Sequence, residues 1–164
     1  MQNYKSIEEI LQEKGSFVWS TTGTSMRPLL KTKRDVVEIS DPKSVYEDGI
    51  LRVNDVALYR PRFSNPDGQY VLHRVRKVCD GYYILCGDNN VLREKVPFDW
   101  VVGVMTGLTR RGKNVDLNGF AYRMYVKHWG SRYRRRIKLK RFFYPIRKKL
   151  RPAVRRIKKL FKRR

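Results

Sequence analysis

One serine and one histidine in this sequence are candidates for side-chain chemistry, as a nucleophile and its base. Ser25 lies in the segment Gly-Thr-Ser-Met-Arg-Pro at 23–28, where a glycine and a proline bend the backbone on either side of a hydroxyl. Such a bend exposes the hydroxyl and leaves nearby backbone N–H groups free to bind an oxyanion. A serine hydroxyl is a weak nucleophile until a base takes its proton. The alternative interpretation, from spacing alone, is a plain polar loop.

His73 is the residue that could supply the base. It lies in the strand-like stretch Val-Leu-His-Arg-Val at 71–75, and it is one of two histidines. The other, His128, falls in a strongly basic region, and we assign it no chemical role. A single histidine in a strand is more often a satisfied, partly buried side chain. His73 therefore needs a partner before a catalytic role is favoured.

A hairpin around Asp80-Gly81 places a carboxylate beside this histidine. Asp-Gly is a strong two-residue turn, and an uninterrupted ladder on either side of it brings His73 opposite Asp88. Directly opposed residues have Cβ atoms about 5 Å apart. Together with Ser25 these two residues would form a Ser–His–carboxylate set, which is recognised by geometry and not by chain order.

The same register separates the two cysteines of the chain. It pairs Cys79 with Tyr82 and Val75 with Cys86, which leaves the cysteines about four rungs, or roughly 13 Å, apart along the ladder. That separation is too large for a disulfide. We therefore expect two reduced thiols, which are compatible with the cytosol.

Short strands must position these groups, because the middle of the chain alternates brief β-like runs with turn residues. The runs lie at 17–20, 36–39, 56–59, 70–78, 82–86, 101–108 and 115–117. Strands this short and evenly spaced predict an all-β domain. No internal repeat is present.

A short amphipathic helix is expected before the strands, ending near Gly15. Its apolar residues at helical spacing are Ile7, Ile10 and Leu11. The pattern as a whole predicts a mainly β fold with a helix in 1–16, a compact β domain in 17–118 and a basic helical extension in 119–164.

Charge divides the chain sharply. All 15 acidic residues lie in 1–118, whereas 119–164 holds more than half of the 38 Lys and Arg residues and no acid. The formal net charge of +23 therefore belongs to the tail. The first sixteen residues lack the pattern of a secretory signal, and no segment reaches the roughly 18 apolar residues of a spanning helix. We expect neither export by the usual route nor a bilayer anchor.

The tail, residues 119–164, carries apolar residues at i, i+4 and i+7 between its lysines and arginines. They are Ile146, Leu150, Ala153, Val154, Ile157, Leu160 and Phe161. This pattern favours an anionic membrane surface, where each cation near the lipid contributes about 1 kcal/mol. Nucleic acid is the alternative partner, through phosphate contacts, and a solvated tail without a dedicated partner is the third interpretation. The expected location is cytoplasmic and peripheral at the membrane.

Three segments together carry a family resemblance. They are Gly-Thr-Ser-Met-Arg-Pro at 23–28, Asn-Asp-Val-Ala-Leu-Tyr-Arg at 54–60, and Val-Leu-His-Arg-Val at 71–75 followed by Gly-Asp-Asn-Asn at 87–90. In this order they resemble the signal-peptidase and LexA-like superfamily of serine peptidases, over roughly residues 17–108. The last pair is most similar to the archaeal and endoplasmic-reticulum signal peptidases, which use Ser–His where bacterial enzymes use Ser–Lys.

The resemblance implies a role for each candidate residue. Ser25 would be the nucleophile, and its backbone N–H the oxyanion donor. His73 would be the general base, and Asp88 the aspartate of the Gly-Asp-Asn box. Related signal peptidases often have a second acid six residues further on, where this sequence has Glu94. Either acid could then orient the base.

This sequence also departs from the family. Some bacterial relatives carry a hydroxyl two residues before the serine, which Gly23 cannot supply, although Thr24 is close enough to contribute locally. Relatives of signal peptidase normally have an N-terminal membrane anchor. Relatives on the LexA side carry a DNA-binding helical domain in front, which sixteen residues cannot form.

These observations predict a serine endopeptidase that cleaves a peptide or protein by acyl-enzyme chemistry, with signal- or leader-peptide processing as a hypothesis by family analogy. The rival prediction is a catalytically inactive peptidase-like domain that binds a membrane or nucleic acid through its tail. No metal or nucleotide cofactor is expected, because the sequence has no Cys/His ligand cluster and no phosphate-cradling glycine loop.

Overall fold

The structure is a computed structural model, and it describes residues 6–62, 69–131, 138–139 and 142. The helices are α1 (Ile7–Lys14), α2 (Pro42–Val45) and α3 (Phe120–Ser131), with one 3₁₀ turn at Phe98–Trp100. The strands are β1 (Ser16–Ser20), β2 (Asp35–Ser40), β3 (Val56–Tyr59), β4 (Val71–Val78), β5 (Tyr82–Cys86), β6 (Glu94–Pro97), β7 (Val101–Arg110) and β8 (Lys113–Asn114).

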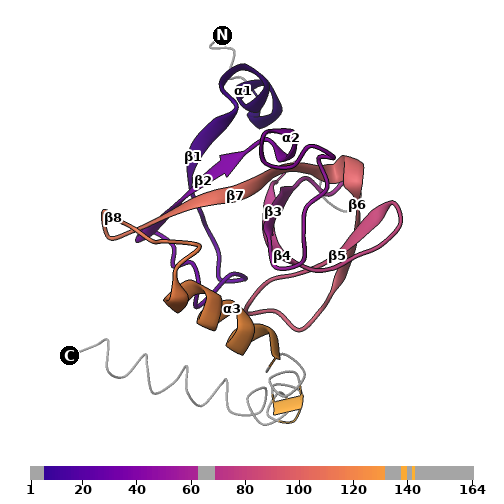
Figure 1. The fold of residues 1–164 in the computed structure, drawn as a ribbon. Coiled ribbons are helices and arrows are strands. Elements are labelled where there is room, and N and C mark those ends of the chain that lie inside the picture. Colours follow the sequence, from indigo (N-terminus) through magenta and orange to yellow (C-terminus); the bar gives the residue numbers. More distant parts are fainter. Residues whose placement is uncertain (1–5, 63–68, 132–137, 140–141, 143–164) are drawn as a thin grey trace, which may run out of the picture. The chain divides into compact units, whose positions relative to one another are not determined.

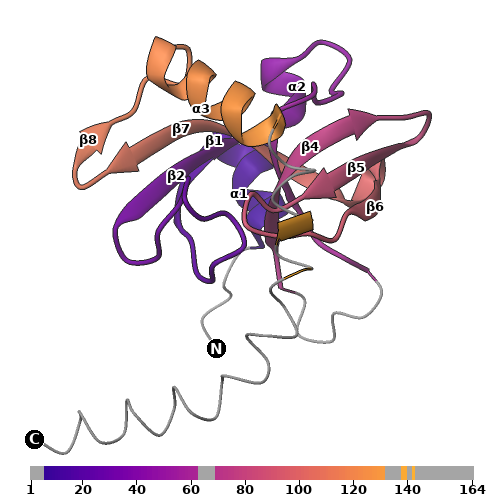
Figure 2. The same ribbon diagram turned by 90° about the horizontal axis from the view of Figure 1, so that it is seen from below.

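The strands form one antiparallel sheet (Figure 1, Figure 2), which confirms the prediction of a mainly β fold. Their order is β1-β2-β7-β3-β4-β5-β6, and β8 pairs with β7. Figure 1 shows the long strand β7 running between β2 and β3, so that it joins the β1–β2 hairpin to the β3–β6 part of the sheet. Strand β3 is buried along its whole length, as expected for a strand covered on both faces.

The predicted N-terminal helix is confirmed as α1. Ser6 and Glu9 form a capping box at its start, and Gly15 ends it with a φ of 71°, a conformation that glycine adopts without strain. Leu11 is buried and lies against the sheet, where α1 contacts β1 and β7. The helix therefore covers an apolar part of the sheet that would otherwise face water.

Most of the predicted strands are present, but the run 115–117 is not one of them. The chain turns earlier than expected, at Arg111 and Gly112, which both have positive φ. The return strand β8 consequently occupies Lys113–Asn114. Sequence patterns also missed α2 and β6, which are only four residues each.

One cluster of the core is formed by residues of β3 to β7 and of the loop before β3. Its buried members are Leu51, Ala57, Tyr59, Val75, Tyr83, Leu85, Val96 and Val104. Burying side chains of this size contributes about 1.5–3 kcal/mol for each large apolar one. Two of the buried residues are tyrosines, whose hydroxyls need partners inside the protein.

The basic region begins with α3, and the chain divides into two units between Met124 and Tyr125, inside this helix. The amphipathic pattern at 146–161 lies outside the described residues. Among the helices that are described, none has the length and apolar character needed to cross a membrane.

Candidate active site

A β-bulge changes the register of the hairpin that carries His73. Val78 pairs with Tyr83 as expected from the Asp-Gly turn, but the ladder shifts between Val75 and Lys77. Val75 then pairs with Leu85 and not with Cys86. A shift of one residue moves side chains to the opposite face. The predicted pairing of His73 with Asp88 is therefore wrong.

The bulge leaves Asp88 in contact with arginines. Its carboxylate accepts two hydrogen bonds from Arg74, at 2.9 and 2.7 Å, and one from Arg76 at 2.9 Å. Asp88 is 0% exposed and Arg74 is 1% exposed. Burial by itself would lower the pKa of Arg74, but the hydrogen bonds and charge of Asp88 raise it above its usual value. This buried ion pair holds the loop after β5 against β4.

Glu94 is the acid beside the histidine. Its Oε1 lies 3.5 Å from His73 Nδ1, while His73 itself is 3% exposed. Tyr59 Oη lies 3.2 Å from the same nitrogen, and the Tyr59 hydroxyl donates a hydrogen bond to Glu94. The hydrogen bond from His73 and then that from Tyr59 lower the pKa of Glu94, against the opposing effect of its partial burial. Of the two predicted acids, the geometry favours Glu94 as the one that orients His73.

Antiparallel pairing explains why these residues meet. Tyr59 ends β3, and His73 lies near the start of β4, where Ala57 is its direct neighbour. Glu94 begins β6 and pairs with Leu85 near the end of β5. Because neighbouring antiparallel strands run in opposite directions, the ends of β3 and β5 lie beside the starts of β4 and β6. The site is built at this one end of four adjacent strands.

The Ser25 loop is attached to the Gly-Asp-Asn-Asn segment by Asn89. The backbone N–H of Asn89 donates to the Ser25 carbonyl at 2.6 Å, and its side-chain amide donates to the Thr24 carbonyl at 3.1 Å. Gly23, with a φ of 87°, supplies the bend before the serine. Buried Met26 and Leu30 anchor the loop after it. Two of the segments that suggested the family resemblance are thus in direct contact.

Gly87 lies between Ser25 and His73. A Cβ on Gly87 would be 2.7 Å from the Ser25 carbonyl oxygen and 3.0 Å from His73 Nε2. Distances below 3.0 Å are not tolerated by packed atoms without movement. The absence of a side chain here lets the serine loop and the imidazole approach each other, with Nε2 facing the serine side. Asn90 also lies on this side, with its amide 3.5 Å from Nε2.

The hydroxyl and the backbone N–H of Ser25 bond to none of the residues that the structure describes, His73 included. Catalytic hydrogen bonds are often long in a site without substrate and tighten when substrate binds. A backbone N–H without such a partner is available to act as an oxyanion donor. Ser25 is partly exposed and therefore accessible to a substrate.

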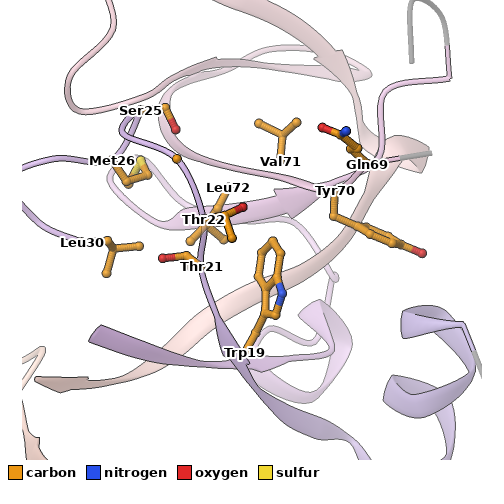
Figure 3. A pocket seen from close by; sticks show the side chains of 11 residues that line it. Trp19, Thr21, Thr22, Ser25, Met26, Leu30, Gln69, Tyr70, Val71 and Leu72 are labelled. Atoms are coloured by element: carbon orange, nitrogen blue, oxygen red, sulfur yellow. The ribbon is translucent and has the colours of Figure 1, made fainter. Parts of the chain in front are cut away.

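A cavity of about 230 Å³ opens beside Ser25. Figure 3 shows Ser25 and Met26 at one end of it, Gln69 and Tyr70 at the other, and Trp19 reaching in from β1. The remaining lining residues are Thr21, Thr22, Gly23, Leu30, Val71 and Leu72. The volume is below the roughly 300–1,000 Å³ of typical small-molecule sites. It suits part of an extended chain better than a whole cofactor.

Three of the residues that line this cavity connect it to other elements of the domain. The Tyr70 hydroxyl donates to Glu8 of α1, and burial together with this hydrogen bond raises the pKa of Tyr70 to about 12. Val71 and Leu72 begin β4, two residues and one residue before His73. One wall of the cavity is therefore continuous with the strand that carries His73.

The predicted site residues thus fall into two groups. His73 lies between Glu94, near its Nδ1, and the Gly87 and Ser25 backbone, near its Nε2 edge, whereas Asp88 bonds to Arg74 and Arg76. Cys79 and Cys86 are both free thiols. Within 6–62, 69–131 and the three described residues that follow, no group of three His, Cys, Asp or Glu residues is arranged to hold a metal.

Sequence patterns missed Tyr59, Gly87 and Asn89 as parts of the site. Tyr59 closes the otherwise apolar run 56–59 with a polar tip, and a buried tyrosine hydroxyl usually has a partner. That signal was present in the sequence but did not identify the partner. Gly87 and Asn89 belong to the Gly-Asp-Asn-Asn segment, in which sequence patterns assign a role only to Asp88.

Comparisons of this chain with models of protein families, with curated proteins and with solved structures each found no match. What the site can do must therefore be argued from its own geometry.

Proposed function

We propose that this chain is a serine peptidase of the signal-peptidase and LexA-like kind, with Ser25 as nucleophile, His73 as general base and Glu94 as the acid that orients the base. Asp88 takes a structural role in this proposal. The bulge that moved Asp88 away from His73 leaves the other acid, at the position where related signal peptidases often carry one, in contact with Nδ1.

One observation carries the proposal. The position that a Cβ of Gly87 would occupy lies within 3.0 Å of both the Ser25 carbonyl oxygen and the Nε2 of His73. Three segments that are distant in sequence supply these groups, and a buried histidine with a carboxylate on its far nitrogen is the arrangement that activates a serine. A polar loop and a satisfied structural histidine, the alternative interpretations, do not require this convergence.

The chemistry would be acyl transfer. Ser25 Oγ attacks a peptide carbonyl while Nε2 of His73 takes its proton and then gives it to the leaving amine. Glu94 stabilises the imidazolium that forms, and the Ser25 N–H binds the oxyanion. Water then hydrolyses the acyl-enzyme after giving a proton to His73. The cavity beside Ser25 would hold a side chain of an extended peptide, and signal- or leader-peptide processing is the activity suggested by the family resemblance.

The test is labelling by a fluorophosphonate, which reacts with activated serines. We expect the full chain to be labelled, and Ser25→Ala and His73→Ala to lose labelling by at least about 1,000-fold. Ser44→Ala is the matched control, because Ser44 is an exposed serine of α2 away from the site. Labelling of wild type no faster than Ser25→Ala would refute the proposal.

A second candidate function rests on the charge distribution. The excess of cations in 119–164 favours an anionic partner, and Ser25 Oγ is not hydrogen-bonded to His73 within the described part of the chain. In this alternative the β domain is an inactive peptidase-like module, and the tail binds a membrane surface or nucleic acid. For the active enzyme the same tail would place the site at the cytoplasmic face of a membrane. Failure of labelling together with vesicle binding would favour the inactive module.

A further inference from the structure

The hydroxyl of Tyr59 lies at the centre of the polar cluster behind His73. Tyr59 is 1% exposed, and its ring is tilted by 53° against the imidazole at a centroid distance of 6.0 Å. It ends β3, diagonally across from His73 on β4, where an aromatic side chain can reach. Glu94, by contrast, begins β6, the last strand of the sheet order, and its side chain is 42% exposed.

The hydrogen bonds at this point allow one arrangement of hydrogens. The Tyr59 hydroxyl gives its single hydrogen to Glu94, so its oxygen can only accept from His73 Nδ1, 3.2 Å away. The Glu94 carboxylate has no hydrogen to give, and its Oε1 lies 3.5 Å from the same nitrogen. Nδ1 therefore faces two acceptors and must carry the hydrogen itself. The neutral ring then has its lone pair on Nε2, on the side of Ser25.

We propose that the Tyr59 hydroxyl is a positioning group that fixes the catalytic tautomer of His73, by donating to Glu94 and accepting from Nδ1. This inference rests on the proposed peptidase site and adds a fourth member to it. Without the hydroxyl, Glu94 loses its buried anchor and turns toward solvent, and Nδ1 loses its nearer acceptor. A base with its hydrogen on Nε2 cannot take a proton from Ser25.

The protonation state of Tyr59 agrees with this role. Burial first, and then the hydrogen bond to Glu94, raise the pKa of Tyr59 above its usual value. The hydroxyl therefore keeps its hydrogen throughout the physiological range and remains a donor to the carboxylate. Tyr59 transfers no proton in the reaction and does not contact the substrate.

The experiment reads the tautomer directly. The full chain is labelled with ¹⁵N-histidine, and long-range ¹H–¹⁵N correlations are recorded at a pH where the rings are neutral. The chain has two histidines, so His128→Gln assigns His73 without ambiguity. We expect the Nδ1–H pattern in wild type and a mixture with Nε2–H in Tyr59→Phe, which removes the hydroxyl and keeps the ring. Fluorophosphonate labelling should fall about 10- to 100-fold in the same variant.

Tyr83→Phe is the matched control. Tyr83 is equally buried, and its hydroxyl accepts from the Leu51 backbone at 2.9 Å, away from the histidine. It should lose comparable stability and keep the Nδ1–H tautomer. An Nε2–H pattern in wild type, an unchanged tautomer in Tyr59→Phe, or an equal change in Tyr83→Phe would overturn the inference.

The spectra separate this inference from the peptidase proposal. A tautomer that depends on Tyr59 in a chain that fluorophosphonate does not label would support the positioning role and refute the peptidase. A chain that fluorophosphonate labels, and whose His73 tautomer is the same in wild type and Tyr59→Phe, would support the peptidase and refute the positioning role. Should Tyr59→Phe not fold, Glu94→Gln replaces it, because an amide N–H would then stand where an acceptor stood. Loss of Nδ1–H is expected there, and its retention would overturn the inference.

Discussion

At the scale of single residues, Gly87 limits how closely the Ser25 loop and the His73 imidazole can approach each other. Its backbone needs no left-handed conformation, so the requirement for glycine is one of space. Any side chain would press on the Ser25 carbonyl and on the edge of the imidazole at once. Either Ser25 or His73 would have to move.

We therefore predict that Gly87→Ala lowers the rate of fluorophosphonate labelling by about 100-fold, which is the effect expected of a displacement near 1 Å in a catalytic site. Gly112→Ala is the control. Gly112 has a φ of 76° with open space around its Cβ position, so alanine there should lower the midpoint of urea unfolding and leave labelling unchanged. Equal labelling of wild type and Gly87→Ala would show that this contact is not critical.

Glu94 leads to a prediction about pH. Because its pKa is lower in the folded than in the unfolded state, the carboxylate stabilises the fold above its unfolded pKa of about 4.3. This contribution is lost as the pH falls through the lower folded value. The free energy of unfolding of wild type should thus exceed that of Glu94→Gln at pH 7, and the two should converge toward pH 3. Urea titrations at several pH values measure this, and a difference that grows on acidification would contradict the assignment.

The sequence was informative about residue types but less so about partners. Ser25 and His73 could be selected because three segments in order resemble a peptidase family, whereas each residue alone also fits a polar loop or a satisfied histidine. The choice between Asp88 and Glu94 could not be made, since it depends on the register of β4 with β5. A single extra residue in that ladder moves His73 out of register with Asp88, which lies in the loop after β5.

At the scale of elements, the two faces of the bulged strand β4 make different contacts. On one side of the strand His73 meets Glu94, and on the other Arg74 meets Asp88. Arg74 also donates to the Asn54 carbonyl at 2.7 Å and to the Tyr122 hydroxyl at 3.3 Å. One arginine therefore joins the turn before β3, the loop after β5 and the first turns of α3.

Removing one partner of this buried pair should be costly. We predict that Asp88→Asn lowers the free energy of unfolding by about 3–5 kcal/mol, since the arginines would keep a buried charge without its counterion. Asp48→Asn is the comparison, because the Arg52–Asp48 pair is largely exposed and should contribute little. Urea denaturation of both variants tests this, and equal effects would argue against a structural role for Asp88.

Regular elements were predictable and irregular ones were not. The capping residues of α1 and the Asp-Gly turn are local signals, and both elements begin and end near their expected positions. The bulge near Arg76 has no such signal, because it follows from how β4 and β5 are fitted to neighbouring strands. Strand β6 has four residues and a single buried one, so its pattern was too short to recognise.

At the scale of the whole molecule, a near-neutral domain is followed by a strongly cationic segment. The β domain has its own core and its own candidate site. In the proposals above, the charge of 119–164 acts by attracting an anionic partner, either a membrane surface or a nucleic acid.

We predict that the full chain co-sediments with vesicles containing anionic phosphatidylserine and not with neutral phosphatidylcholine vesicles. Cations near the surface each contribute about 1 kcal/mol, and salt screens them over about 10 Å at 0.1 M. Binding should therefore fall as salt is raised from 0.1 to 0.5 M. Sedimentation with neither kind of vesicle would exclude the membrane proposal, and a stronger salt-sensitive binding to RNA or DNA would favour the nucleic-acid alternative.

The contact between the Ser25 loop and Asn89 also has a consequence for the order of events during synthesis. It joins chain positions 65 residues apart, and Glu94 comes later still. Closing so long a loop is slow and is compensated only when the intervening strands are in place. In a nascent chain, Ser25 would be synthesised long before the residues that complete the proposed site. The proposed activity would then appear only with the last strands of the sheet, and the proposed peptidase could not cut itself or its neighbours while its chain was unfinished.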